Sequence, residues 1–237
     1  MYMKNVLLAA AAGLLFCCQS PRGQMSSPVN EEGWIALFDG SSVEQWRGVN
    51  TDSFPGKGWK VEDGQLIVLG GGGDIITKEQ YADFHLKAEF KLTPGSNSGI
   101  KYFVQLYRDS LKNNFYALGL EYQLLDDDRH PDAKKGSHEG SRTLASLYDL
   151  IKAENKQPNP IGEWNQAEII SKGNHVEHWL NGRKVLEYER GSETFRQLVA
   201  GSKYKDIKNF GEHNQGYILL QDHGDTVYYR NIYIKKL

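Results

Sequence analysis

The stretch "DFHLKAEFKLTPGSNSGIKYFVQLY" (residues 83–107) decides the fold class. Apolar and polar side chains alternate on both sides of "TPGSNSG" (93–99), and a period of two residues is typical of a half-buried strand. Pro, Gly, Ser and Asn between the two runs favour a turn. The stretch therefore predicts two strands with a short connection between them.

The same pattern recurs along the chain. "GWKVEDGQLIVLG" (58–70) and "EHWLNGRKVLEYE" (177–189) predict hairpins that turn at Asp63-Gly64 and Asn181-Gly182. The segment 216–237 predicts the last two strands, and "TFRQLVAGSKY" (194–204) predicts a short helix. Residues 126–163 lack a clear period and predict a long crossing loop. We therefore expect an all-β antiparallel sandwich with at most one or two short helices.

Composition limits the possible functions. The chain has 237 residues, 39% of them hydrophobic, which is enough for one sizeable core. The formal net charge of −2 gives no basic field for nucleic acid and no polybasic membrane patch. We expect one domain over residues 32–237 that does not bind nucleic acid.

The first residues have the pattern of an export signal. Lys4 precedes an apolar run from Val6 to Phe16, and Cys17 and Cys18 follow directly. The run is short for a membrane span, and a cysteine directly after "LLF" resembles a lipoprotein signal. We expect a signal at 1–18, lipidation of Cys18 or else of Cys17, and a tether at 19–31. This predicts an extracytoplasmic, periplasmic or outer-membrane protein that contacts membrane only through its lipid; an ordinary cleaved signal is the alternative.

The stretch "YALGLEYQLLDDDRHPD" (116–132) holds the first candidate site. Glu121 and Gln123 alternate with apolar neighbours and therefore share one face of a strand. A bulge after Gln123 would bring Asp126 to the same face. Two carboxyl groups there would suit acid–base chemistry on a sugar. A solvated sheet face, and aspartates that cap a turn, are the alternatives.

Other polar residues are candidates by position. Gln221 and His223 share a face before Gly224, and Asn97 and Lys101 begin a strand. A histidine exchanges protons near neutral pH, and indole rings stack on sugars. Surface, loop or core roles are the alternatives for each. The remaining candidates are His138, Arg142 and Tyr148 in the long loop, Trp164 directly after it, and His178 and Trp179 in the hairpin at 177–189.

The ordered motifs resemble the 3-keto-disaccharide hydrolase domain family, which is abundant in Bacteroidetes lipoproteins. The resemblance runs from about Gly33 to Leu237 and rests on "GWIALFDGSSVEQW", "NSGIKYF", "LEYQLLDD", "EWNQAEII", "HWLNG" and "ILLQDHGDTVYYRNIYI". It implies a concanavalin A-like jelly-roll sandwich. It also implies cleavage of glycosides that are already oxidised at C3, through 3-keto-glucoside-1,2-lyase and 3-keto-2-hydroxy-glucal hydratase steps.

The resemblance gives the candidates roles. Glu121, His138 and His223 would supply base and acid, with Asp126 beside them, and Lys101 or one divalent ion held near Glu121 would stabilise an enolate. Endo-β-glucanases of the same fold class carry Glu-x-Asp-x-x-Glu, where this chain has Gln123 and Asp126 in place of the last two acids. A non-catalytic carbohydrate-binding sandwich and a conventional glycoside hydrolase remain the alternatives. The expected sugar-binding residues are Asn97, Gln123, Arg142, Tyr148, Trp164, His178, Trp179 and Gln221.

Overall fold

A computed structural model describes residues 32–237. The expected signal, the lipidation candidates Cys17 and Cys18, and the tether lie outside the described residues. Within them, no helix is long and apolar enough to cross a membrane. The elements are β1 (Trp34–Phe38), β2 (Trp46–Gly48), β3 (Trp59–Glu62), β4 (Gln65–Val68), β5 (Ile75–Thr77), β6 (Phe84–Leu92), β7 (Asn97–Asp109), β8 (Asn114–Leu125), β9 (Trp164–Lys172), β10 (His175–Leu180), β11 (Arg183–Glu189), α1 (Glu193–Ala200), β12 (Tyr217–Leu220) and β13 (Val227–Lys236), with a 3-10 turn at Pro131–Lys134.

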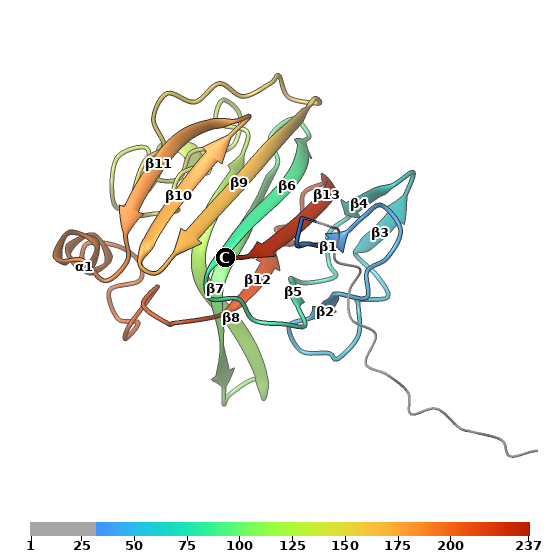
Figure 1. Ribbon diagram of the computed structural model, residues 1–237, viewed down its shortest axis with the longest axis horizontal. Helices are drawn as coiled ribbons and strands as arrows, with labels where there is room; N and C mark the ends of the chain where they lie inside the picture. Colours follow the sequence, from blue (N-terminus) through green and yellow to red (C-terminus); the bar gives the residue numbers. More distant parts are fainter. Residues whose placement is uncertain (1–31) are drawn as a thin grey trace, which may run out of the picture.

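The strands form two antiparallel sheets, so the predicted all-β sandwich is confirmed (Figure 1). One sheet has eight strands in the order β11-β10-β9-β6-β13-β4-β3, with β1 on β13. The other has five strands in the order β2-β5-β12-β7-β8. In the smaller sheet β2, β5, β12 and the β7–β8 hairpin come from distant parts of the chain, so residues from four separate segments meet on each of its faces.

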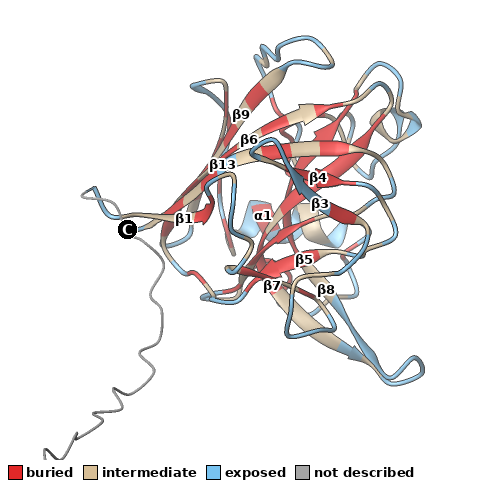
Figure 2. Cartoon of the chain, turned by 90° about the vertical axis from the view of Figure 1, so that its right-hand side faces the viewer, coloured by how far each residue is buried: buried red, intermediate tan, exposed pale blue. Residues whose placement is uncertain are grey.

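The core lies between the sheets and follows from strict alternation. Every second residue of β6 is buried, from Phe84 to Leu92. From the smaller sheet, Tyr102 and Phe103 pack against Phe84 with ring centroids 6.3 and 5.8 Å away. Figure 2 shows the buried residues along the strands and the exposed residues mainly in the connecting loops. Each sheet thus has an inner apolar face and an outer face that is free to carry polar groups.

The two predicted hairpin turns are also confirmed. Asp63 and Gly64 have φ of 49° and 72°, and Asn181 and Gly182 have φ of 50° and 74°. Positive φ at both central residues matches the right-handed twist of the flanking strands. The predicted helix forms as α1, where the Ser192 side chain caps the N-terminus by accepting from the Phe195 N–H.

The long loop is an ordered part of the smaller sheet. Its residues 145–148 run beside β8: the Ala145 N–H donates to the Gln123 carbonyl at 2.8 Å, and the Tyr148 N–H donates to the Glu121 carbonyl at 3.0 Å. Asp149 then fixes the loop, since its carboxylate accepts four hydrogen bonds, from both Ser137 groups, Arg142 and Lys203. Although burial opposes it, this set of donors lowers the pKa of Asp149 to about 2.

Candidate functional site

The outer face of the five-stranded sheet gathers five of the predicted polar residues. In the register of β7 and β8, Lys101 pairs with Glu121 and Gly99 pairs with Gln123. On the other side of β7, Leu219 pairs with Lys101, and the Gln221 N–H donates to the Gly99 carbonyl. Because alternate residues share a face, these side chains line the outer face together with Asn97. We call Asn97, Lys101, Glu121, Gln123 and Gln221 the polar face.

Glu121 is the central group of the polar face. Its side chain is only 4% exposed, and it forms an ion pair with the Lys101 ammonium at 3.6 Å. The carboxylate lies over Gly99, where a Cβ would come within 2.6 Å of Oε1. Within residues 32–237 no group donates a hydrogen bond to this carboxylate. Burying a charge with so few partners lowers the stability of the fold, so stability does not explain why Glu121 is buried here.

Like the Glu121 carboxylate, the amide side chains around Gly99 are buried and short of hydrogen-bond partners. The side-chain oxygens of Asn97, Gln123 and Gln221 are buried and have no hydrogen-bond donor among residues 32–237. Buried acceptors are normally satisfied, and exceptions need an explanation such as a bound water or ligand. The hydroxyl groups of a sugar would supply the missing donors. Amide and carboxylate oxygens would also suit a hard divalent cation, but Lys101 already places a positive charge beside Glu121.

Sequence reasoning missed Asp74, which lies directly before β5 at the end of the glycine run 70–73. The N–H of Asp222 donates to Asp74 Oδ1 at 2.9 Å, across a separation of 148 residues. Burial raises the pKa of Asp74 above its usual value; Lys101 and His223 oppose this shift, and the charge of Asp222 adds to it. An acid directly after a glycine run was the signal in the sequence that could have identified Asp74. Its neighbours in the structure come from β7 and the segment after β12, which are far away in the sequence.

The candidate His223 lies beside this acid. Its side chain is exposed, and its charge lowers the pKa of Asp74. The preceding residue, Asp222, has a structural role, because its carboxylate accepts the N–H groups of Gly72 and Gly73, each at 2.8 Å. The glycine run is therefore anchored to the end of β12, and this anchor holds Asp74 and His223 near each other.

Tyr148 and Lys203 lie at the other side of Glu121. The Lys203 Nζ is 4.1 Å from the centre of the Tyr148 ring. Desolvation lowers the pKa of Lys203, and the charge of Glu121 raises it again. The Tyr148 hydroxyl donates to Asp132 at 2.8 Å. Arg142, predicted to bind sugar, instead forms ion pairs with Asp132 and Asp149 at 3.0 and 2.8 Å, so it positions Tyr148.

The structure does not bring Asp126 and His138 to the polar face. β8 has no bulge after Gln123, because its pairing with β7 is regular from Gln123 to Leu125. Asp126 instead caps the turn at the end of the strand, accepting from the Gly95 N–H at 2.8 Å and from Arg129 at 3.0 Å. The ring of His138 packs near Gly201 and donates to the Leu198 carbonyl at 3.1 Å, so it attaches the long loop to α1.

Three other predicted sugar contacts also lie elsewhere. His178 is fully buried between the sheets, where Nδ1 donates to the Ala145 carbonyl and Nε2 accepts from Tyr102. Burial lowers its pKa to about 4, so it is neutral at physiological pH. Trp164 and Trp179 lie on the outer face of the eight-stranded sheet, on the opposite side of the sandwich.

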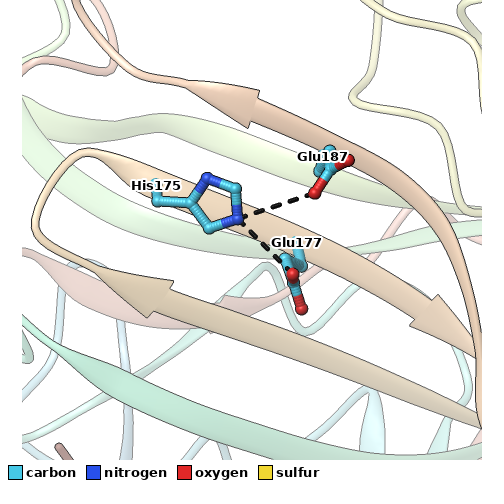
Figure 3. Close-up of side chains that lie close together, drawn as sticks. All are labelled: His175, Glu177 and Glu187. Atoms are coloured by element: carbon cyan, nitrogen blue, oxygen red, sulfur yellow. Dashed lines mark hydrogen bonds and ion pairs between the residues drawn. The ribbon is translucent and has the colours of Figure 1, made fainter.

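That opposite face also carries a group with metal-ligand chemistry. His175 Nε2 lies 3.4 Å from Glu177 and 3.7 Å from Glu187, with ligand atoms within 4.8 Å of one another (Figure 3). Lys184 reaches both carboxylates, at 3.2 and 2.6 Å, and His175 also contacts Glu189 at 2.7 Å. The cluster is thus a largely exposed ion-pair network in which three carboxylates share two basic groups.

Comparison with known proteins identifies the family of the chain. Residues 33–235 match the family model of the 3-keto-alpha-glucoside-1,2-lyase-like domain. The chain belongs to this family. It is also 37% identical over 235 residues to the 3-keto-disaccharide hydrolase of Bacteroides thetaiotaomicron, covering 89% of this chain and 80% of that protein.

Solved structures confirm the fold. A glycosyl hydrolase homologue from Parabacteroides distasonis superposes with a TM-score of 0.75 at 35% identity, covering 87% of this chain and 94% of that chain. A Bacillus subtilis protein with a galectin-like fold gives a TM-score of 0.50 at 14% identity, covering 82% and 90%. The second likeness concerns the fold alone. Together these comparisons place the chain among glycoside-cleaving hydrolases with a jelly-roll sandwich.

Proposed function

We propose that this protein cleaves glycosides that carry a ketone at C3, by elimination across C1 and C2 followed by hydration. The observation that carries the proposal is the Glu121 carboxylate, which is buried on the polar face and forms an ion pair with Lys101 at 3.6 Å. Membership of the 3-keto-alpha-glucoside-1,2-lyase-like family supports the ketone-bearing substrate.

The chemistry needs a base and a cation at the positions where these residues lie. A C3 ketone acidifies the hydrogen on C2, and the Glu121 carboxylate removes that proton. Negative charge moves to the C3 oxygen, where the Lys101 ammonium stabilises it. When the ketone re-forms, the C1–O1 bond breaks and the aglycone leaves with a proton. Water then adds to C1 and Glu121 returns a proton to C2, so the sum is hydrolysis.

The arrangement of acids favours this route over conventional glycoside hydrolysis. A retaining glycosidase needs two carboxyl groups about 5–5.5 Å apart across the bond to be cleaved. On β8 the residue two positions after Glu121 is the amide Gln123, and Asp126 is occupied in a turn. An amide cannot attack the sugar, but it can orient it, and the unpaired oxygens of Asn97, Gln123 and Gln221 would accept from hydroxyl groups.

The test compares an oxidised glucoside with its parent. The purified protein should release the aglycone from 3-keto-glucosides and leave the unoxidised glucosides intact. In deuterium oxide, the recovered 3-keto-glucose should carry deuterium at C2. Release without C2 labelling would contradict the elimination step, rapid cleavage of the parent glucoside would favour a conventional hydrolase, and binding without release would favour a carbohydrate-binding sandwich.

We also propose an extracytoplasmic, lipid-anchored location, supported by the apolar run that ends at Cys17 and Cys18. A lipidated N-terminal cysteine provides more than one acyl chain, which is what stable attachment to a membrane requires. Cys18→Ser should move the protein from the membrane fraction to the soluble fraction. Retention of this variant in the membrane, with release of Cys17→Ser, would assign the lipid to Cys17.

A further inference from the structure

A cavity of about 610 Å³ opens beside the polar face. Its walls come from three segments: the loop after β2, the glycine run before β5, and the start of β8. The wall residues that matter here are Val49, Asn50, Asp74, Phe115 and Tyr116. This volume is in the range of small-molecule sites. Asp74 is the one carboxylate in its lining, and it is also the residue that connects the cavity to the polar face.

The walls are fixed by contacts that join distant segments. The Asn50 side chain accepts from the Phe115 N–H at 2.6 Å and donates to the Phe115 carbonyl at 2.9 Å, so the loop after β2 is tied to β8. Trp59 donates from its indole N–H to the Gly73 carbonyl at 2.8 Å, which holds the glycine run. The cavity is thus formed before any ligand binds.

Two aromatic side chains give the cavity an apolar wall. Phe115 and Tyr116 are 45% and 47% exposed and pair with Arg108 and Tyr107 near the turn between β7 and β8. Figure 1 shows that this hairpin extends beyond the sandwich. Tyr107 stacks on Tyr116 with ring centroids 5.5 Å apart and planes at 21°, which fixes the Tyr116 ring. Exposed aromatic side chains beside polar groups are suited to a sugar or aryl ring.

Asp74 lies between this cavity and Glu121 along the sheet. Its neighbour Ile75 pairs with Leu220, β12 pairs with β7, and β7 pairs with β8. Three strand spacings separate Asp74 from Glu121, or on the order of 14 Å between backbones, which leaves room for one sugar ring between the two side chains. One Asp74 oxygen accepts from the Asp222 N–H, and no other residue among 32–237 donates to the carboxylate.

We propose that this cavity binds the aglycone, a ring-shaped alcohol such as a second sugar or an aryl alcohol, and that Asp74 protonates its leaving oxygen. This inference rests on the proposed function. In the elimination, Glu121 takes the C2 proton, the C1–O1 electron pair stays on the aglycone oxygen, and the Asp74 proton neutralises it. In the hydration, the Asp74 carboxylate accepts a proton from the water that adds to C1. Both acids then return to their starting states.

The electrostatics of Asp74 suit an acid. Burial raises its pKa and the charge of Asp222 adds to the shift, so the protonated form persists to higher pH than in an ordinary aspartate. Lys101, the hydrogen bond from the Asp222 N–H and His223 oppose the shift without cancelling it, and Lys57 also lines the cavity. The rate with unactivated aglycones should therefore fall as pH rises through the pKa of Asp74.

The first experiment varies the leaving group. Elimination rates are measured for 3-keto-glucosides of methanol, glucose and 4-nitrophenol with the wild type, Asp74→Asn and Asp39→Asn, the last being a control in an exposed turn. Asp74→Asn should lose roughly 10²–10⁴-fold with methanol and glucose, the usual contribution of a positioned acid, and less than about tenfold with 4-nitrophenol, whose anion leaves unaided. The alkaline decline in rate should disappear in the same variant.

Equal losses with all three aglycones, or a loss as large in Asp39→Asn, would overturn the role of Asp74. Failure of the proposed function itself would look different. In that case the wild type would release no aglycone from any of the three compounds, or would release it without exchange of the C2 hydrogen.

The second experiment tests the apolar wall. Tyr116→Ala should raise KM for the aryl and disaccharide substrates roughly 5- to 30-fold, because stacking of this kind is worth about 1–2 kcal/mol. KM for the methyl glycoside should stay within about twofold. Leu111→Ala, at a side chain that is 97% exposed near the end of the same hairpin, is the matched control. An equal rise in KM for all three substrates would place the aglycone outside this cavity.

Discussion

The outer faces of the two sheets both carry charged side chains, but they satisfy them differently. On the eight-stranded sheet, Glu168 contacts His85 at 2.8 Å and Lys87 at 3.6 Å, and Glu89 contacts Arg230 at 2.6 Å. These groups keep partial contact with water. On the five-stranded sheet, Glu121 has Lys101 at 3.6 Å and is nearly excluded from water. The adjacent amide oxygens have no hydrogen-bond donor within residues 32–237.

The carboxylates on the outer face of the eight-stranded sheet are paired with basic groups, whereas the polar groups on the outer face of the five-stranded sheet are available to a ligand. Exposed ion pairs contribute little to folding, typically about 0–1 kcal/mol, and tolerate change. A buried carboxylate and three buried acceptors without donors reduce stability unless a ligand satisfies them. The outer face of the five-stranded sheet therefore lowers the stability of the fold in favour of binding and catalysis. Matched substitutions on the two outer faces should differ in their effects on activity and stability.

The largest difference should come from removing one negative charge on each face. Glu121→Gln keeps the shape of the side chain but removes the base, so the rate of C2 proton removal should fall roughly 10²–10⁴-fold. Glu168→Gln should change the rate less than about twofold, because Glu168 lies on the opposite face. Exchange of the C2 hydrogen of a non-cleavable 3-keto sugar is the measurement. Equal exchange in both variants would remove Glu121 from the role of base.

The next largest difference should come from the cations. Lys101→Met removes the charge that stabilises the enolate and should lower kcat roughly 10²–10³-fold, as for loss of one preorganised electrostatic contact. Lys87→Met is the control on the other face, where Glu168 keeps His85 as a partner. Steady-state kinetics with a chromogenic 3-keto-glucoside would measure both. If only KM rises in Lys101→Met, the lysine binds substrate without stabilising the transition state.

A smaller effect, on stability, should come from the loop that borders the active face. Asp149 is fully buried and its pKa is lowered to about 2, so its native contacts stabilise the fold by about 2–3 kcal/mol at neutral pH. This contribution is present above the unfolded pKa and is lost as pH falls from about 4 to 2.

Asp149→Asn should therefore destabilise the protein by about 2 kcal/mol or more at pH 7 in urea unfolding, because an amide donor would face the donors of Ser137 and Lys203. The difference from wild type should shrink toward pH 2. Glu177→Gln, on the outer face of the eight-stranded sheet, should change stability by less than about 0.5 kcal/mol. A difference between Asp149→Asn and wild type that does not vary with pH would contradict the role of the lowered pKa.

The smallest effect should have the opposite sign. Gln123→Met replaces a buried amide, whose oxygen lacks a donor, by an apolar side chain of similar size. Stability should rise by roughly 0.5–1 kcal/mol while KM for the 3-keto sugar increases, because a sugar hydroxyl loses its acceptor. Thermal unfolding and steady-state kinetics on one sample would show both changes. A loss of stability would mean that a bound water already satisfies Gln123 in the free protein.

The sequence by itself determined the strands, their turns and the pairs of residues that share a face. Alternation from Phe84 to Leu92 fixes an inner and an outer side, Asn181-Gly182 fixes a hairpin, and the same rule places Glu121 and Gln123 together. These features depend only on local geometry and on neighbours one or two residues away.

Tertiary structure alone decided which outer face holds the site and which distant residues complete it. Alternation places His178 and Trp179 on opposite faces of a strand, but it does not say which face packs against the other sheet. In the structure His178 lies in the core and Trp179 on the far side of the sandwich. Asp126 stays in a turn because the register of β8 needs no bulge. Asp74 reaches the polar face through pairing among β5, β12 and β7, fixed by a hydrogen bond to Asp222 across 148 residues. Such contacts arise from sheet order, which depends on the packing of the whole chain and which no local pattern encodes.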